Sequence, residues 1–116
     1  MSIPWVRLYQ SFYATEIYTC SLLSGESSDA INIPNHTDNA VQITGTFGAA
    51  VTVQGALHPT TPIYATMKDA NGNDLSFTAD SPPTQILPGP YALKVVAGAV
   101  TGIVATLKLN GKGRVG

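Results

Sequence analysis

Residues 39–57, NAVQITGTFGAAVTVQGAL, carry the clearest structural signal in this chain of 116 residues. In both halves, β-branched or aromatic residues alternate with polar or small ones; Val41, Ile43 and Phe47, for example, share one parity. Such alternation is typical of a half-buried antiparallel strand. Glycines occupy positions where a chain bends, bulges or lets another backbone approach. They are Gly45, Gly48 and Gly55. The stretch therefore predicts two strands joined at a glycine-rich corner.

The same alternation continues on both sides of this stretch. Further strands are predicted at residues 16–23, 30–33, 63–68, 75–79, 84–87, 91–96 and 103–109, with a turn at 35–39. The Asn71-Gly72 pair tolerates the positive φ angles of a type I′ turn and predicts a hairpin between 63–68 and 75–79. Seven to nine short strands with a turn signal every 8–12 residues predict an all-β, single-domain antiparallel sandwich or small barrel.

Composition limits the possible partners. Charged residues make up only 11% of the chain, against about a quarter in an average globular domain, and the net charge is −1. No global field therefore attracts nucleic acid or a membrane, and a weakly charged surface suits a protein packed against neighbours. The last nine residues hold three basic residues and no acid: Lys108, Lys112 and Arg114. They predict a flexible basic tail over 110–116 or, alternatively, a contact with an acidic partner or nucleic acid.

Cellular location is constrained by the single cysteine and the N-terminus. Cys20 alone excludes an intrachain disulfide, which fits a reducing compartment or an assembly site where disulfides are not used. The first residues lack a charged segment followed by an apolar run, so no signal peptide is expected. No window approaches 18 apolar residues, so no membrane span is expected.

Residues 1–18 hold five of the nine aromatic residues and are predicted to form an aromatic N-terminal arm preceding a β-sandwich domain at 19–109. Trp5, Tyr9, Phe12 and Tyr13 have helical spacing, but Pro4 and the lack of good helix formers favour an extended segment. These side chains either close one end of their own core or reach a neighbouring subunit as anchors.

Candidate metal and catalytic residues are few. His36 and His58 lie in predicted loops without the ligand pattern of a metal site, and neither orients Cys20 as a nucleophile. We expect two solvated imidazoles and a buried apolar thiol.

The segment 69–80 invites comparison with a calcium loop. Asp69, Asn71, Asn73 and Asp80 fall at positions 1, 3, 5 and 12, but Gly72 falls at position 4 instead of 6, and the flanks are predicted strands. A hairpin turn explains the same residues without a metal. No phosphate loop, tuned carboxylate pair or basic–aromatic patch is evident, so we expect no enzyme activity and no cofactor.

Three motifs together resemble small structural proteins of tailed bacteriophages. They are GTFGAAVTVQG (45–55), MKDANGNDLSFTA (67–79) and LPGPYALKVVAG (87–98), within a match that covers a little over half of the chain. Two departures stand out: ALHPTTPIY (56–64) replaces a polar loop and a Trp, with Tyr64 near the aromatic position, and Tyr91-Ala92-Leu93 lacks a basic Arg.

The resemblance implies a capsid decoration or cement protein with a jelly-roll-like β sandwich. It implies the virion surface as location, assembly in the host cytoplasm, the major capsid protein as partner, a homo-oligomer, and no nucleic acid, membrane or small-molecule substrate. Trp5, Tyr9, Phe12 and Tyr13 would then anchor the arm. Two alternatives remain: a tail or fibre-adaptor protein, and a carbohydrate-binding module using Trp5, Tyr64 or Tyr91.

Overall fold

The computed structural model describes residues 2–10, 15–32, 36–57, 60–87, 92–98 and 100–111. Every regular element in these ranges is a β-strand, and none of the ranges contains a helix long and apolar enough to cross a lipid bilayer. The strands are β1 (Ser2–Ile3), β2 (Val6–Gln10), β3 (Thr15–Leu22), β4 (Ser27–Ser28), β5 (Ile31–Asn32), β6 (His36–Phe47), β7 (Val51–Ala56), β8 (Ala65–Thr66), β9 (Ser76–Phe77), β10 (Thr84–Ile86), β11 (Ala92–Ala97) and β12 (Val100–Gly111).

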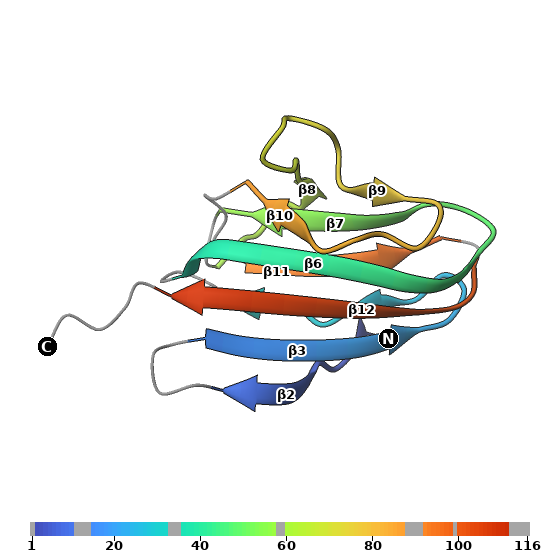
Figure 1. The fold of residues 1–116 in the computed structure, drawn as a ribbon, viewed down its shortest axis with the longest axis horizontal. Helices are drawn as coiled ribbons and strands as arrows, with labels where there is room; N and C mark the ends of the chain where they lie inside the picture. The colour runs from blue at the N-terminus through green and yellow to red at the C-terminus, as the bar shows by residue number, and fades with distance from the viewer. Residues whose placement is uncertain are drawn as a thin grey trace, which may run out of the picture.

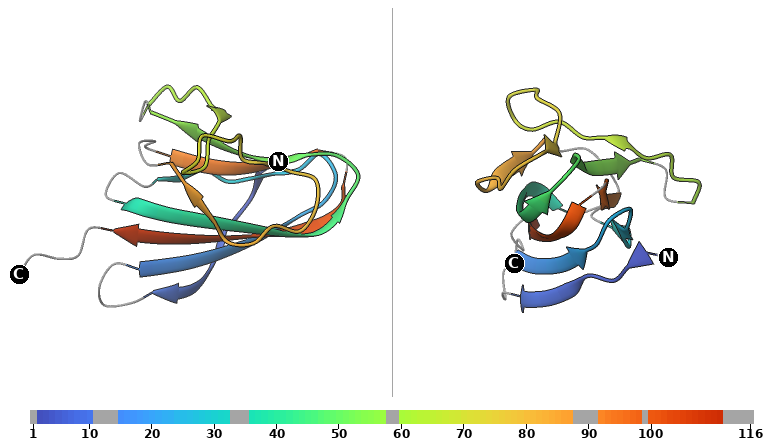
Figure 2. Two further views of the ribbon diagram at one scale, coloured as in Figure 1. Left: turned by 45° about the horizontal axis from the view of Figure 1, so that its top comes forward. Right: turned by 90° about the vertical axis from the view of Figure 1, so that its right-hand side faces the viewer.

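The strands form two stacked sheets, which confirms the predicted all-β sandwich (Figures 1 and 2). The five-stranded sheet has the order β10-β6-β12-β3-β2. The seven-stranded sheet follows β1-β4-β11-β7-β8, with β5 also on β11 and β9 also on β7. All pairings between these strands are antiparallel except that of β1 with β4.

The long β6–β12 pair is the centre of the five-stranded sheet. β12 contacts β6 along one edge and β3 along the other, with Leu107 opposite both Val41 and Tyr18. Residues of one parity face the seven-stranded sheet and are almost fully buried, as period-two alternation requires. In β12 they are Ile103, Ala105, Leu107 and Leu109, and in β6 they include Val41 and Ile43.

The other side of the core comes from β7 and β11. Their inward residues are Val51, Val53, Leu93, Val95 and Ala97, and Leu75 and Ile86 complete the interior. Because both sheets contribute apolar side chains to one cluster, neither sheet has a buried face without the other.

The glycine-rich corner is confirmed, and it connects the two sheets. β6 belongs to one sheet and β7 to the other, so the chain crosses the end of the sandwich instead of forming a hairpin. Gly45 has φ +140°, a conformation that L side chains rarely adopt. A Cβ there would lie 2.7 Å from Ile103 Cα and closer still to Gly102 O. Glycine thus permits the close approach of β6 to β12 near the corner.

Several local predictions need correction. The predicted hairpin of 63–68 with 75–79 is confined to its end, where the Lys68–Asp74 bridge and the Leu75 N–H bond to Met67 O (2.8 Å) join the segments, while β8 and β9 each pair with β7. Its turn is a three-residue loop and not type I′: Asp69 N–H donates to Asn73 O (2.8 Å), and Gly72 has φ +85°. The predicted turn at 35–39 is wrong, since β6 begins at His36 in register with Gly111.

The predicted segment boundaries also fall inside strands. Residues 15–18 belong to β3, where they pair with the last part of β12, so residue 18 does not end a separate arm. β12 continues to Gly111, one residue beyond the predicted start of the tail at 110. Residues 112–116 lie outside the described residues.

Candidate interaction surface

The described part of the interior is mostly apolar, with Ser28, Asn39 and Ser81 as its buried polar residues, and holds no reactive cluster. Within the described ranges, no group of three or more His, Cys, Asp or Glu side chains could hold a metal ion. Cys20 is 2% exposed on the inner face of β3, and its Sγ lies 3.6 Å from Ile3 O. Desolvation by burial, and secondarily the charges of Asp29 and Glu26, raises the pKa of the Cys20 thiol from 9.0 to about 11. The thiol is therefore protonated at neutral pH and a poor nucleophile.

The two predicted loop histidines cannot be placed in a site. The backbone of His36 starts β6, while its side chain and the whole of His58 lie outside the described residues.

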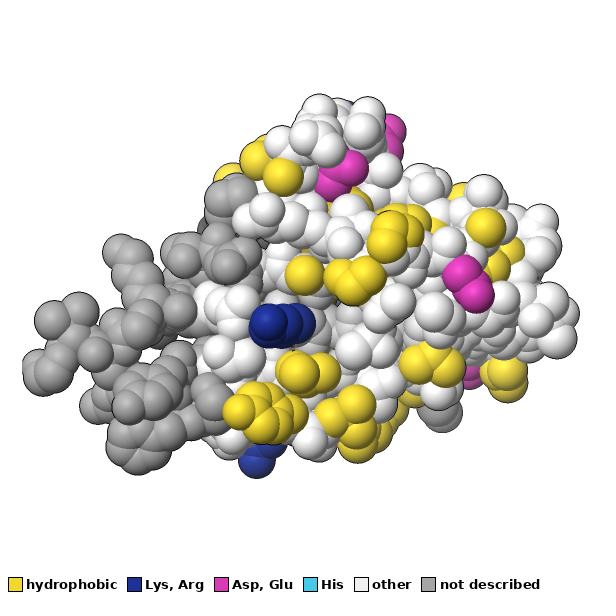
Figure 3. Space-filling view, in the orientation of Figure 1, with side chains coloured by type: hydrophobic (Ala, Val, Ile, Leu, Met, Phe, Trp, Pro, Cys, Tyr) yellow, Lys and Arg dark blue, Asp and Glu magenta, His cyan; other side chains and the backbone are white. Residues whose placement is uncertain are grey.

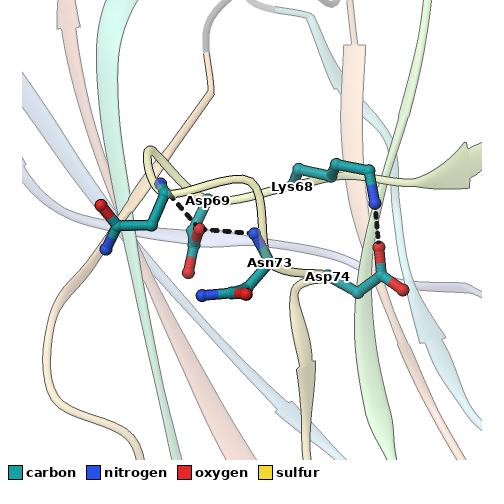
Figure 4. Close-up of polar contacts among 5 residues, drawn as sticks. Lys68, Asp69, Asn73 and Asp74 are labelled. Carbon is teal, nitrogen blue, oxygen red and sulfur yellow. Dashed lines mark hydrogen bonds and ion pairs between the residues drawn. The ribbon is translucent and has the colours of Figure 1, made fainter.

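The acidic loop at 69–74 is organised by its own hydrogen bonds (Figure 4). Asp69 Oδ1 accepts from the backbone N–H groups of Asn71 and Asn73, both at 2.9 Å. Asp74 Oδ1 lies 2.6 Å from Lys68 Nζ in an exposed ion pair. The two bonds to Asp69 Oδ1 are those of an Asx-type turn, in which the carboxylate replaces a backbone acceptor.

Asp80, the fourth predicted calcium ligand, serves another element. Its Oδ1 accepts the Gly45 N–H at 2.8 Å, and the neighbouring Ser81 Oγ accepts the Ile43 N–H at 3.0 Å. The side chains of the segment after β9 thus accept hydrogen bonds from backbone N–H groups of β6 that lie beyond the end of its pairing with β10. The sequence pattern of a calcium loop is explained by a turn and an edge contact.

Of the four predicted anchors, Trp5 is part of the protein's own fold. Its Nε1–H donates to Asp29 O at 2.8 Å, and the half-buried ring packs against the core cluster. Asp29 also bonds the neighbouring segment: its N–H donates to Ile3 O at 2.7 Å, and its carboxylate accepts the Ser2 hydroxyl. Residues 2–5 therefore hold β1 against the seven-stranded sheet, while β2 joins the five-stranded one.

Tyr9, by contrast, is exposed. All five residues of β2 are exposed, including Val6 (58%), Leu8 (62%) and Tyr9 (51%). Val6 pairs with Thr19 and Tyr9 pairs with Ile17, and both of these β3 residues point away from the core, so Val6 and Tyr9 do so too. Leu8 is the extra residue at the register shift between Arg7 and Tyr9. Phe12 and Tyr13 lie outside the described residues.

The outer face of β6, β12 and β3 is hereafter called the five-strand face, and its described side chains are nearly all uncharged (Figure 3). Its described outward residues are Ala40, Gln42, Thr44, Val104, Thr106, Lys108, Asn110, Thr15, Ile17, Thr19 and Ser21. Lys108 is the only charged one among them, and Val104 is 39% exposed. In Figure 3 apolar side chains gather over the β12, β3 and β2 side of this face. A sheet face in contact with water normally carries more charge.

A second exposed apolar feature lies at the other sheet. Leu57 and Ile63, on either side of a proline-containing loop, are 74% and 86% exposed. Tyr64, the residue after Ile63, makes a cation–π contact, with Lys94 Nζ 4.3 Å from the centre of its ring. Of the two tyrosines predicted for a carbohydrate platform, Tyr64 thus contacts Lys94, and Tyr91 lies outside the described residues.

Neither the five-strand face nor the Leu57–Ile63 pair is predicted from the sequence. The face had a signal, because the polar parity of 103–109 contains Val104 and one lone lysine. The pair had none, since much of any protein surface is apolar and the sequence does not mark which apolar loop residues stay exposed.

No family model matches the chain, and no curated protein is significantly similar to it in sequence. Solved structures do resemble it in fold. The SPBc2 prophage-derived protein YomS matches with a TM-score of 0.61 and 9% identity, over 89% of this chain and 99% of YomS. A Klebsiella pneumoniae protein with a double-stranded β-helix domain matches with a TM-score of 0.58 and 6% identity, over 99% and 81%. A cupin domain from Bordetella pertussis gives 0.51 and 9%, over 94% and 93%.

At these identities the comparisons establish the fold alone: a jelly-roll-like β sandwich, as predicted. Function has to be argued from the surface of this chain.

Proposed function

We propose that this protein is a structural component of a tailed-phage particle, a capsid decoration protein that binds the outer surface of the major capsid protein lattice without catalysing a reaction. The observation that carries the proposal is that large apolar side chains stay exposed although the protein has a well-filled apolar core. The interior is filled by apolar side chains, while large apolar side chains remain exposed on β2 and at Leu57 and Ile63. Exposed apolar residues that gather in one place mark protein–protein contacts, and β2 presents Val6, Leu8 and Tyr9 within five residues.

Two further points support this assignment. The sequence motifs at 45–55, 67–79 and 87–98 resemble small phage structural proteins, and the fold resembles that of a prophage-derived protein. All three motif regions contribute to the sandwich, as β7, the 68–74 loop and β11. The resemblance therefore concerns the β sandwich itself, which leaves its loops and outer faces available for binding.

The proposed mechanism is mechanical. A decoration protein stabilises the shell by burying area across joints between capsid subunits; a standard interface buries on the order of 1,600 Å² in total. Repetition over many joints adds multivalent binding without requiring a strong single contact.

The test is co-sedimentation of the purified protein with capsids stripped of their decoration. Saturable binding at a fixed ratio to the major capsid protein is expected. Two matched variants identify the surface: Tyr9→Ser tests the exposed part of the predicted arm, and Ile63→Ser tests the loop. Asn71→Ser, in the hydrogen-bonded turn, is the control that should bind normally. A folded wild-type protein that does not bind capsids would overturn the proposal.

The alternative with specific support is a tail or adaptor protein, because the same sandwich and exposed groups would serve there. Localisation in intact particles by labelled antibody distinguishes the two: capsid faces for decoration, the tail or its junction for the alternative.

A further inference from the structure

We infer that the five-strand face is covered by a second copy of this chain, in a two-fold symmetric dimer that stacks the two five-stranded sheets face to face. The inference concerns self-association and does not rest on the proposed capsid binding.

The composition of the face points to a protein partner. Its described outward residues are almost all uncharged, and apolar side chains lie over β12, β3 and β2 (Figure 3). Depletion of charge at the centre of a patch is a property that distinguishes interface cores from the rest of a surface. Val6, Tyr9 and Val104 supply exposed apolar area around the uncharged Thr and Gln residues.

The charges on and beside the face are arranged for a second copy. Lys108 is exposed and lies on β12 near one end of the face, opposite Ala40. Towards the other end, the Oδ1 atom of the exposed Asp80 is held 2.8 Å from Gly45 N, and Gly45 pairs with Ile103. Lys108 lies five positions after Ile103 on β12, so the two charges lie ~17 Å apart along the strand direction.

Two-fold symmetry turns this arrangement into complementarity. We take the two-fold axis to lie between the two stacked faces, perpendicular to the strands. This axis places each end of one face over the opposite end of the other face. Lys108 of each protomer then lies opposite Asp80 of the other, so one contact is formed twice, as in any isologous interface. The angle of about 30° between stacked sheets and the length of the lysine side chain accommodate the different strand positions of the two groups.

The size of the face is adequate for such a dimer. β6, β12 and β3 have 12, 12 and 8 residues, which at ~3.3 Å per residue and ~4.8 Å between strands cover ~500 Å² in projection. The accessible area of the corrugated face is larger than its projection. It approaches the ~800 Å² that each partner contributes to a standard interface.

Charge-reversal variants test the inference in solution. Lys108→Asp places two carboxylates opposite each other across the interface, and Asp80→Lys places two ammonium groups opposite each other, so each variant alone should be monomeric. Mixed together, the two variants should form a heterodimer, because both contacts then join groups of opposite charge again. Sedimentation velocity and native mass spectrometry measure the species. Lys68→Asp, the same charge change on the exposed 68–74 loop, should dimerise like the wild type.

A second variant covers the case in which Asp80→Lys unfolds because Gly45 loses its acceptor. Thr106 lies between Lys108 and Ile103 on β12, near the expected axis. Thr106→Cys should therefore give a disulfide-linked dimer under mild oxidation, while Cys20 stays buried and unreactive. A wild-type protein that is monomeric at high concentration would overturn the inference. So would dimers that ignore both charge reversals and do not crosslink through the introduced thiol.

Discussion

Among single residues, Gly45 shows how one position without a side chain sets the geometry of the sandwich. It lies where β6 approaches the backbone of β12, just before the chain leaves for the second sheet. Its positive φ and the contact with Gly102 O both exclude a Cβ. The glycine-rich pattern predicts a corner here, and the structure supplies the reason for it.

We expect Gly45→Ala to be strongly destabilising, by about 3 kcal/mol or more, since backbone strain and a clash with backbone atoms combine. Gly102→Ala is the matched control: its Cβ would meet only Leu23 Cδ2 at 3.8 Å, so a change below about 1 kcal/mol is expected. Urea unfolding followed by circular dichroism measures both. Similar losses in the two variants would contradict this explanation.

Cys20 is the residue whose titration should affect stability. Because the folded protein raises the pKa of the thiol from 9.0 to about 11, the proton is held more tightly in the folded than in the unfolded chain. The corresponding stabilisation is complete below pH ~9 and is lost as the pH rises through about 11. Desolvation, with a hydrogen bond to Glu16, also raises the pKa of Tyr18, which acts in the same direction.

The free energy of unfolding should therefore decrease between pH ~9 and pH ~11. Cys20→Ala should reduce this decrease, leaving the part due to Tyr18. Denaturant titrations of both proteins at neutral pH and at several points across this window make the comparison. If the two pH profiles have the same slope, the thiol is not responsible.

Among the structural elements, the N-terminal segment joins the two sheets. β1 pairs with β4 in the seven-stranded sheet, β2 pairs with β3 in the five-stranded one, and Trp5 lies between them on Asp29. The predicted arm is thus divided by function: residues 2–5 hold the fold together, while β2 presents exposed side chains.

Trp5→Ala should cost about 2 kcal/mol or more of unfolding free energy, because a half-buried ring and a hydrogen bond are lost together. Tyr9→Ala should change stability by less than about 0.5 kcal/mol, since that ring is exposed. Circular dichroism has to report unfolding, because Trp5 is the only tryptophan. Equal stability losses would mean that Trp5 is not part of the core.

For the molecule as a whole, low charge and an apolar interior fit a protein that works by assembly. The five-strand face and the Leu57–Ile63 loop belong to different sheets, so the proposed capsid binding, where it uses this loop, leaves the face free for self-association. Stacking the five-stranded sheets of two copies would leave both Leu57–Ile63 loops accessible. In the co-sedimentation experiment, the ratio of this protein to the major capsid protein would then correspond to bound dimers.

The fold class and most strand positions could be predicted from the sequence. Alternation in 39–57 and 103–109 is a local property of the chain, and it predicts the central strands and their buried residues correctly. The place of the corner could be predicted as well, because glycine and strand periodicity are both local features. The resemblance to phage structural proteins also came from the sequence.

Strand pairing and side-chain exposure, in contrast, became known only from the three-dimensional arrangement. β8 and β9 pair with β7 instead of each other, because β7 offers two partly free stretches that a local hairpin signal does not reveal. Trp5 is committed to the fold and Tyr9 is exposed, although both are aromatic residues of the same segment. Asp69 and Asp80 serve different elements despite their calcium-like spacing. Pairing and burial depend on contacts between residues distant in sequence, and so does the five-strand face, whose outward residues come from three strands separated by most of the chain.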